Sequence, residues 1–278
     1  MQIKWYIYYF LFGYISTSFA MELPANETVI LERAALESER THALLQDLSD
    51  GGELGAQLRQ ACIKGDEEEV KRVIGIGAHV NARDNWNGHS ALFNATQYGY
   101  IKIVQYLLDK GAFIDDCYNL NMLTPLMVAA SYGYKEIATL LLERGAFVNI
   151  QDFDGKTALM HAVRNGYTDI VRVLLDHGAD VTIRGTYGKT ALLYAAGYGH
   201  EEIVQMLTQK GASFDPRDIE TAFNTLKSAI YVGCNKGAHM LIGLLAYSRD
   251  LKGKTALDYA WAEKSHNIVV QLIEHLTR

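Results

Sequence analysis

The chain has 278 residues, of which 49% are hydrophobic and 21% charged, and its net charge is −6. Three prolines and no low-complexity tract exclude long disordered linkers, and the length is sufficient for a large core. The acidic balance excludes a protein that is drawn to nucleic acid by its overall charge.

Residues 1–20 are predicted to be a secretory signal peptide. Lys4 is their only charge, residues 5–12 are apolar or aromatic, and small residues stand at the last position and two positions before it. We therefore expect cleavage after Ala20, which would change the net charge to −7 by removing Lys4. A membrane anchor is one alternative. Translation that starts at Met21, which would leave a cytoplasmic protein, is another.

Residues 21–52 are predicted to form an acidic helix followed by a Gly-Gly linker. Asn26 can cap a helix that runs to about Leu48 with a partial apolar stripe. Between residues 21 and 60 there are eight acids and three arginines, a net charge of −5. The helix either covers the end of the following domain or docks a partner as a short coiled coil.

One motif then recurs through the centre of the chain. It contains Ala-Leu, an alanine, a glycine, Ile-Val-x-x-Leu-Leu and Gly-Ala, and its opening leucines, Leu92, Leu126, Leu159 and Leu192, are 34, 33 and 33 residues apart. A fixed period of this size is typical of a solenoid, because one unit cannot bury its apolar face alone. We therefore predict an all-α solenoid of helix-turn-helix units.

The physical role of each repeated position is readable within one unit. A hydroxyl side chain caps the first helix, an alanine permits close packing, and a glycine ends the helix in a left-handed turn. The Ile-Val-x-x-Leu-Leu spacing gives the second helix a buried stripe, and a second glycine ends it. The caps are Ser90, Thr124, Thr157 and Thr190; the first glycines are Gly99, Gly133, Gly166 and Gly199; the second are Gly111, Gly145, Gly178 and Gly211.

The repeat resembles the ankyrin family over roughly residues 56–276. Thr124-Pro125-Leu126 is nearest to the family's helix-opening motif, and the other copies read Thr-Ala-Leu or Ser-Ala-Leu. The resemblance implies an ankyrin-repeat stack with β-hairpin loops. The family usually has His after the opening Leu, so its inter-repeat hydrogen-bond network is in question here, where the position holds Phe93, Met127, Met160, Leu193 and Asp258.

The ankyrin-repeat domain is predicted to span residues 53–278 with about six to seven repeats. Its first unit opens the second helix with four acids at 66–69, which complement the helix dipole. The pattern is strong over residues 87–215 and degenerate over 216–250, where the Ile-Val signature is lost. Residues 251–278 are predicted to be a C-terminal capping repeat.

The sequence contains no recognisable catalytic or metal-binding pattern. Its histidines lack zinc spacing, and no G-x-S-x-G or phosphate-binding loop occurs, because the glycines serve the repeat geometry. We therefore expect no enzyme, no cofactor and no metal; the alternative is an enzyme of unseen type within residues 213–250. Cys62, Cys117 and Cys234 are expected to be free thiols, and a disulfide between the first two is the alternative.

The positions that the repeat frame leaves free define a candidate partner-binding surface. The loop tips hold Trp86, Leu120, Phe153 and Tyr187; the position before the capping hydroxyl holds His89, Leu123, Lys156 and Lys189; the end of the first helix holds Tyr98, Tyr132, Arg164 and Tyr198. Tyr, Trp and Arg are the side chains that most often anchor interfaces. Alternatively, about half of these rings pack between repeats, Tyr98, Tyr132 and Tyr198 foremost. Trp86 and Phe153 are then the first candidates for contact.

Together these features predict an exported, non-catalytic scaffold that binds a protein partner through a concave face of loop tips and first helices. We expect a monomer that binds no nucleic acid and stays out of the membrane once the signal peptide is removed. A signal peptide on an ankyrin array resembles exported bacterial ankyrin proteins, which implies a periplasmic or secreted location. A structural or oligomer-forming component and a host-directed bacterial effector are the alternatives.

Overall fold

The computed structural model describes residues 52–84, 87–117, 121–249, 252–262 and 266–277. The predicted signal peptide and nearly all of the predicted acidic helix and linker lie outside these residues. Gly52, which the sequence suggested as the end of the linker, is the first residue of a helix.

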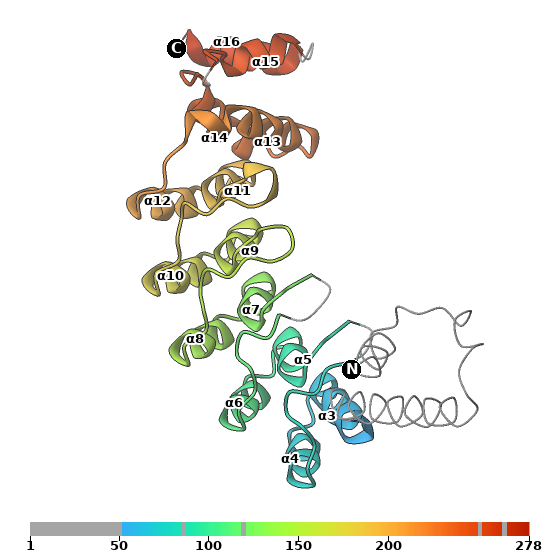
Figure 1. The fold of residues 1–278 in the computed structure, drawn as a ribbon. Coiled ribbons are helices and arrows are strands. Elements are labelled where there is room, and N and C mark those ends of the chain that lie inside the picture. The colour runs from blue at the N-terminus through green and yellow to red at the C-terminus, as the bar shows by residue number, and fades with distance from the viewer. Residues whose placement is uncertain (1–51, 85–86, 118–120, 250–251, 263–265, 278) are drawn as a thin grey trace, which may run out of the picture.

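Fourteen α-helices occur in the described part of the chain, arranged as seven consecutive pairs. Figure 1 shows the odd-numbered helices in one row and the even-numbered helices in a second row, from α3 and α4 at one end to α15 and α16 at the other. The bounds of the pairs are α3 Gly52–Lys64 and α4 Glu67–Gly75, α5 Ala91–Gln97 and α6 Ile101–Asp109, α7 Pro125–Tyr132 and α8 Lys135–Glu143, α9 Ala158–Asn165 and α10 Thr168–Asp176, α11 Ala191–Gly197 and α12 Glu201–Gln209, α13 Ile219–Tyr231 and α14 Asn235–Leu245, and α15 Ala256–Ala262 and α16 His266–Leu276.

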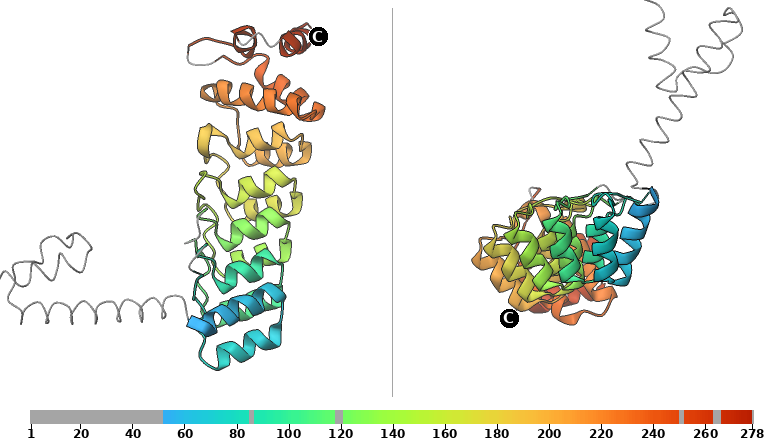
Figure 2. Two further views of the ribbon diagram at one scale, coloured as in Figure 1. Left: turned by 90° about the vertical axis from the view of Figure 1, so that its right-hand side faces the viewer. Right: turned by 90° about the horizontal axis from the view of Figure 1, so that it is seen from below.

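The architecture confirms the predicted all-α solenoid. Figure 2 shows the helix pairs as layers of one elongated stack, in which each pair packs on the next. The loops that join the pairs are extended, but within the described residues they form only isolated bridges, such as the one between Arg83 and Ser90. Two short 3₁₀ turns also occur, Thr186–Gly188 and Pro216–Asp218.

The predicted caps open α5, α7, α9 and α11. Thr157 Oγ1 accepts a hydrogen bond from the backbone N–H of Met160, and Ser90, Thr124 and Thr190 make the same contact in their own repeats. In the last repeat the cap is reciprocal, because the Thr255 hydroxyl and backbone N–H also donate to the Asp258 carboxylate.

Aromatic rings from the next repeat lie over the glycines that end the first helices. Gly99 has φ +78°, and a β-carbon built on it would come within 2.9 Å of the Tyr134 ring. This position needs glycine for two reasons, the left-handed backbone and the ring above it. We call the set of these contacts the ring ladder; it consists of Tyr100 on Gly65, Tyr134 on Gly99, Tyr167 on Gly133 and His200 on Gly166.

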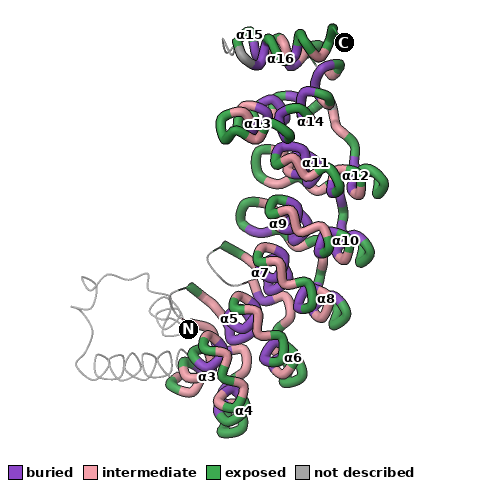
Figure 3. The backbone as a smooth tube through the Cα atoms, turned by 180° about the vertical axis from the view of Figure 1, so that it is seen from behind, coloured by how far each residue is buried: buried purple, intermediate pink, exposed green. Residues whose placement is uncertain are grey.

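The hydrophobic core is divided into two clusters. The first extends from Leu58 to Ala212, and the second from Leu193 to Leu272, so that α11 supplies residues to both. Figure 3 shows the buried residues where neighbouring helices meet and exposed residues at the outer turns. At the boundary α14 packs closely against α11. A β-carbon built on Gly237 would come within 2.3 Å of the Gly197 carbonyl oxygen, so only glycine fits there.

Candidate protein-binding face

The loops between repeats are fastened to one another by a recurring side chain. Asn149 Nδ2 donates to the Gly178 carbonyl at 3.4 Å, and Asn149 Oδ1 accepts from the Asp180 backbone N–H at 2.9 Å. Asn81 Nδ2 likewise donates to the Gly111 carbonyl, and Asn81 Oδ1 accepts from the Phe113 backbone N–H; Asp115 accepts from the Phe147 N–H. These contacts join neighbouring loops, and the position of the family histidine is filled by buried apolar side chains in the central repeats.

A buried carboxylate organises the loop before α9. Asp152 Oδ1 accepts the backbone N–H of Lys156 at 2.7 Å, and Asp152 Oδ2 lies 2.8 Å from His161 Nε2. Burial opposes ionisation of Asp152, but the hydrogen bonds with His161 and with the Lys156 N–H outweigh it, so the pKa of this carboxyl is lower than usual. The loop between Asp152 and its helix is therefore held in one shape.

Two predicted tip residues project from these ordered loops. Phe153 is 77% exposed and Tyr187 is 86% exposed. The Phe153 N–H donates to the Asn121 carbonyl at 3.0 Å, and the neighbouring Thr186 N–H donates to the Asp154 carbonyl at 2.7 Å, so consecutive tips are tied together. Trp86 and Leu120, the other two predicted tip residues, lie outside the residues that the structure describes.

The four residues that precede the capping hydroxyls have different surroundings. His89 stacks on Phe93 with ring centres 4.1 Å apart, and Leu123 is half-buried against the first core. Lys156 forms an ion pair with Asp154 at 2.6 Å, whereas Lys189 Nζ lies 5.7 Å from the centre of a tyrosine ring. These four side chains are therefore not equally available to a partner, and part of Leu123 is covered by the first core.

The predicted tyrosines at the ends of the first helices are half-exposed. Tyr98, Tyr132 and Tyr198 are 48%, 51% and 45% exposed, and each stacks on the ring two residues further along. The ring that enters the gap between repeats is that second ring, a member of the ring ladder. The predicted tyrosines thus keep one face free, and Arg164 is exposed in the same row.

Those predicted residues that the structure describes lie along a broad surface with two edges. Loop tips and cap-preceding residues lie at the start of each first helix, while the tyrosines and Arg164 lie at its end. A helix such as α9 has eight residues, so the two edges are about 12 Å apart. We call this surface, made by the loop tips and the exposed side of α5, α7, α9 and α11, the loop face.

The sequence did not single out two features of this surface. Tyr194 lies half-buried on α11 between the two edges, and the Asp152–His161 pair fixes the loop beside it. An aromatic or imidazole side chain directly after the first glycine, as at Tyr134, was the available signal for the ring ladder. The pairing itself depends on how neighbouring repeats superpose.

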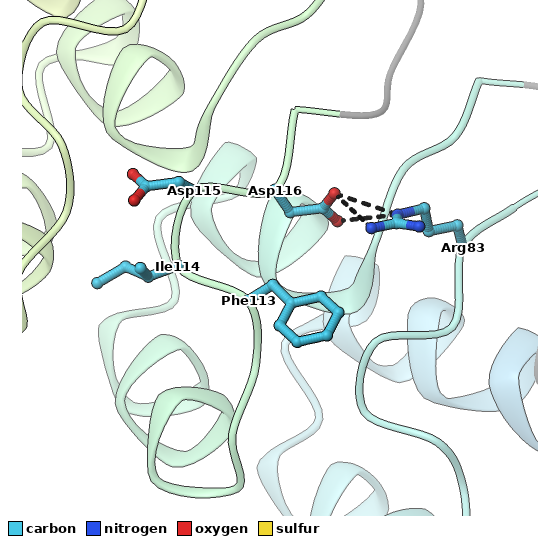
Figure 4. Close-up of a pocket in the computed structure, with 5 residues that line it drawn as sticks. All are labelled: Arg83, Phe113, Ile114, Asp115 and Asp116. Atoms are coloured by element: carbon cyan, nitrogen blue, oxygen red, sulfur yellow. Dashed lines mark hydrogen bonds and ion pairs between the residues drawn. The ribbon is translucent and has the colours of Figure 1, made fainter.

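One open pocket of about 540 Å³ lies between the loops that precede α5 and α7 (Figure 4). The Arg83 guanidinium lies 3.0 Å from the Asp116 carboxylate, which is almost fully buried, and Asp115 points away from this pair. Burial raises the pKa of Asp115, while the Phe147 N–H bonded to it acts in the opposite direction. The charged groups of the pocket therefore hold the loops together.

The described part of the chain contains no group of three or more His, Cys, Asp or Glu side chains that could hold a metal ion. The three cysteines are free, as expected, and Cys62 is buried. None of the helices in the described ranges is long and apolar enough to cross a membrane.

Paired helices, layers that contact only their neighbours and a surface of exposed loop residues define a repeat solenoid of the protein-binding class. The family model described as "Ankyrin repeats (3 copies)" matches residues 58–152 and 147–218, which is more than half of the chain. The chain therefore belongs to the ankyrin-repeat family, whose arrays act as protein–protein interaction scaffolds and are generally non-enzymatic. Among curated proteins no match was found.

Proposed function

We propose that this chain is an exported scaffold that binds a protein partner through its loop face. The observation that carries the proposal is the pair of exposed tip rings, Phe153 and Tyr187, on loops whose backbones are bonded to neighbouring loops. Large apolar rings that stand in water lose solvent contact when a partner covers them. Fixed loops lose little conformational entropy on binding, which favours affinity.

The loop face is tested by removing the two tip rings together. We expect the Phe153→Ala, Tyr187→Ala double variant to weaken partner capture about tenfold or more, because such rings are frequent interface anchors. Tyr247→Ala, which removes a ring that is 74% exposed beyond α14, is the control and should leave capture intact. Equal capture by both variants would place the partner elsewhere, and a thermal melt of each variant monitors folding.

The export proposal rests on the composition of residues 1–20 and has its own test. Mass spectrometry of the chain produced in its native host should find a mature N-terminus at Met21. Ala20→Arg should block cleavage, because signal peptidase sites need a small residue there. An intact Met1 terminus in the native host would contradict export by cleavage, and a Met21 terminus that persists in the Ala20→Arg variant would support translation from Met21, the cytoplasmic alternative.

The structural alternative is distinguished by mass in solution. Residues 21–278 are proposed to be monomeric, and light scattering after size-exclusion chromatography measures this directly. A stable oligomer would favour an assembly role. A host-directed effector is distinguished by location, since it would be recovered inside host cells rather than in the periplasm or medium.

A further inference from the structure

Two cations on the loop face converge on one tyrosine. Lys189 Nζ lies 5.7 Å from the centre of the Tyr194 ring, within the range of a cation–π contact. Burial raises the pKa of the Tyr194 phenol; the positive charges of Lys156 and Arg164 lower it, and the Asp154 carboxylate, which pairs with Lys156, raises it. Arg164 is exposed in the last turn of α9, one repeat upstream of Lys189, and its charge acts on the same ring.

These two cations differ from most others on the stack. Lys156 is neutralised by Asp154 at 2.6 Å, but among the described residues neither Arg164 nor Lys189 pairs with a carboxylate. Elsewhere, cations of one repeat are matched by acids of the next or the previous one, as in Lys135–Asp169, Arg144–Asp109, Arg172–Glu202, Lys210–Asp176 and Lys236–Glu201. In a chain of net charge −6, an unbalanced positive site on the loop face needs an explanation.

The upstream half of the loop face has another character. The position of Lys156 and Lys189 is occupied by His89 before α5 and Leu123 before α7. Burial lowers the pKa of His89, although the Asp84 charge opposes this, so the neutral ring is favoured. The position of Tyr194 is occupied by the buried Asn94 and Val128 in the same two repeats. At these two positions the loop face thus has uncharged side chains over α5 and α7, whereas over α9 and α11 it has the cations Lys156 and Lys189.

We propose that the loop face binds an acidic peptide segment of the partner protein, with carboxylates at Arg164 and Lys189 beside Tyr194. This inference rests on the proposed function and adds the chemistry of the partner. A guanidinium can hold a carboxylate through two parallel hydrogen bonds. The neighbouring Tyr194 ring excludes water from one side of the site, which strengthens the attraction between cation and carboxylate. The apolar part of the same segment lies over α5 and α7, which gives it a fixed direction.

The dimensions suit a short extended segment. Packed helices are about 8–10 Å apart, so the three steps from α5 to α11 cover roughly 30 Å. An extended chain covers that length in about nine residues. A nucleic acid is a poorer match, because two cations in an acidic protein fall short of the roughly 6–10 phosphate contacts on which DNA affinity commonly depends.

The test is a selection from displayed random peptides of about 12 residues on the purified full chain. We expect Asp and Glu to be enriched in the selected peptides, and the enrichment to disappear on the Arg164→Gln, Lys189→Gln double variant. The control is Arg144→Gln with Lys210→Gln, two cations that already have carboxylate partners. This control should retain the enrichment, and thermal melts establish that both variants fold.

Direct binding gives the magnitude. An enriched peptide, labelled for fluorescence anisotropy, should bind at least about tenfold more tightly than its Gln and Asn counterpart at low salt. The difference should shrink when NaCl is raised from about 50 to about 500 mM. The inference is overturned if acids are not enriched, if the double variant selects them equally, or if single-stranded DNA binds more tightly than the peptide.

The same selection separates this inference from the proposed function. Neutral peptides that lose binding on the Phe153→Ala, Tyr187→Ala variant would leave the loop face as the binding surface and reject an acidic partner. Peptides that bind both double variants as tightly as the parent chain would reject both the loop face as the binding surface and the acidic partner. Acidic peptides that lose binding on each of the two double variants support both the loop face as the binding surface and the acidic partner.

Discussion

The phenol ring of Tyr134 lies over Gly99 of the preceding repeat, so close that a β-carbon on Gly99 would come within 2.9 Å of it. The Tyr134 hydroxyl also lies 3.4 Å from the Gln97 carbonyl, to which it donates a hydrogen bond. The Tyr134 ring thus packs on the end of the upstream helix α5 and connects two repeats. The glycine that ends the second helix, Gly111, has the same left-handed backbone but nothing within 4 Å of its would-be β-carbon.

This pair of glycines gives the first prediction. Gly111→Ala should lower the free energy of unfolding by about 1–2 kcal/mol, the cost of a left-handed alanine. Gly99→Ala should cost about 1–3 kcal/mol more, because the new methyl also meets the Tyr134 ring. Urea denaturation measures both. Equal losses would mean that the ring moves aside freely, and Gly99→Ala combined with Tyr134→Ala should recover part of the difference.

The second prediction concerns the side chain that fastens neighbouring loops. Asn149→Ala should destabilise the chain by about 1–3 kcal/mol, since it removes two hydrogen bonds between repeats. The matched change Asn224→Ala on the exposed side of α13 should have little effect. Denaturant titrations of both variants supply the comparison, and a similar stability for the two would show that the loops are held by other contacts.

The third prediction is a pH dependence at Asp152. Its pKa is lower in the folded chain than in the unfolded one, so the ionised carboxylate stabilises the fold. This contribution is complete above the unfolded value of about 3.9 and is lost as the pH falls through the lower folded value. We expect Asp152→Asn to cost about 1–2 kcal/mol at neutral pH and less as the pH drops below about 4.

Denaturation curves at several pH values test this sign. Asp169→Asn, at an exposed ion pair with Lys135, is the control and should change stability little at any of them. A cost at Asp152 that stays constant from neutral to acid conditions would contradict a role for its charge.

The fourth prediction concerns thiol chemistry. Burial raises the pKa of the Cys62 thiol to about 12, so only about one molecule in ten thousand carries the reactive thiolate at pH 8. In the folded chain iodoacetamide should modify Cys117 and Cys234, which are half-buried, and leave Cys62 intact. Peptide mass spectrometry before and after addition of denaturant gives the answer; rapid native labelling of Cys62 would show that the first repeat opens readily.

The sequence was sufficient for the repeat frame because each frame residue acts within its own unit. A threonine such as Thr157 caps the helix that it precedes, and a glycine such as Gly133 ends its own helix, so the periodic pattern predicts both. The same locality allowed the tip ring Phe153 to be recognised as exposed. Its exposure follows from its place in a loop rather than from any partner.

Contacts between repeats were beyond the sequence. The stacking of Tyr134 on Gly99 and the bonds of Asn149 join residues about 30 or more positions apart, and their geometry depends on the twist of one layer on the next. For the same reason the sequence placed Arg164 and Lys189 on a binding surface without showing that they lack carboxylate partners. The contact of the half-buried Leu123 with the first core was beyond the sequence as well, because it is also set by this superposition.

The division of the core at α11 has a consequence for how the chain opens. Leu192 and Ala195 face the first cluster, and Leu193 and Ala196 the second, so α11 carries the coupling between them. In a linear stack, cooperativity passes only between neighbours, and a seam of this kind lets α13–α16 open while the upstream layers stay folded. Amide hydrogens downstream of α11 should therefore exchange first, and a ligand on the loop face should slow exchange upstream of the seam far more than beyond it.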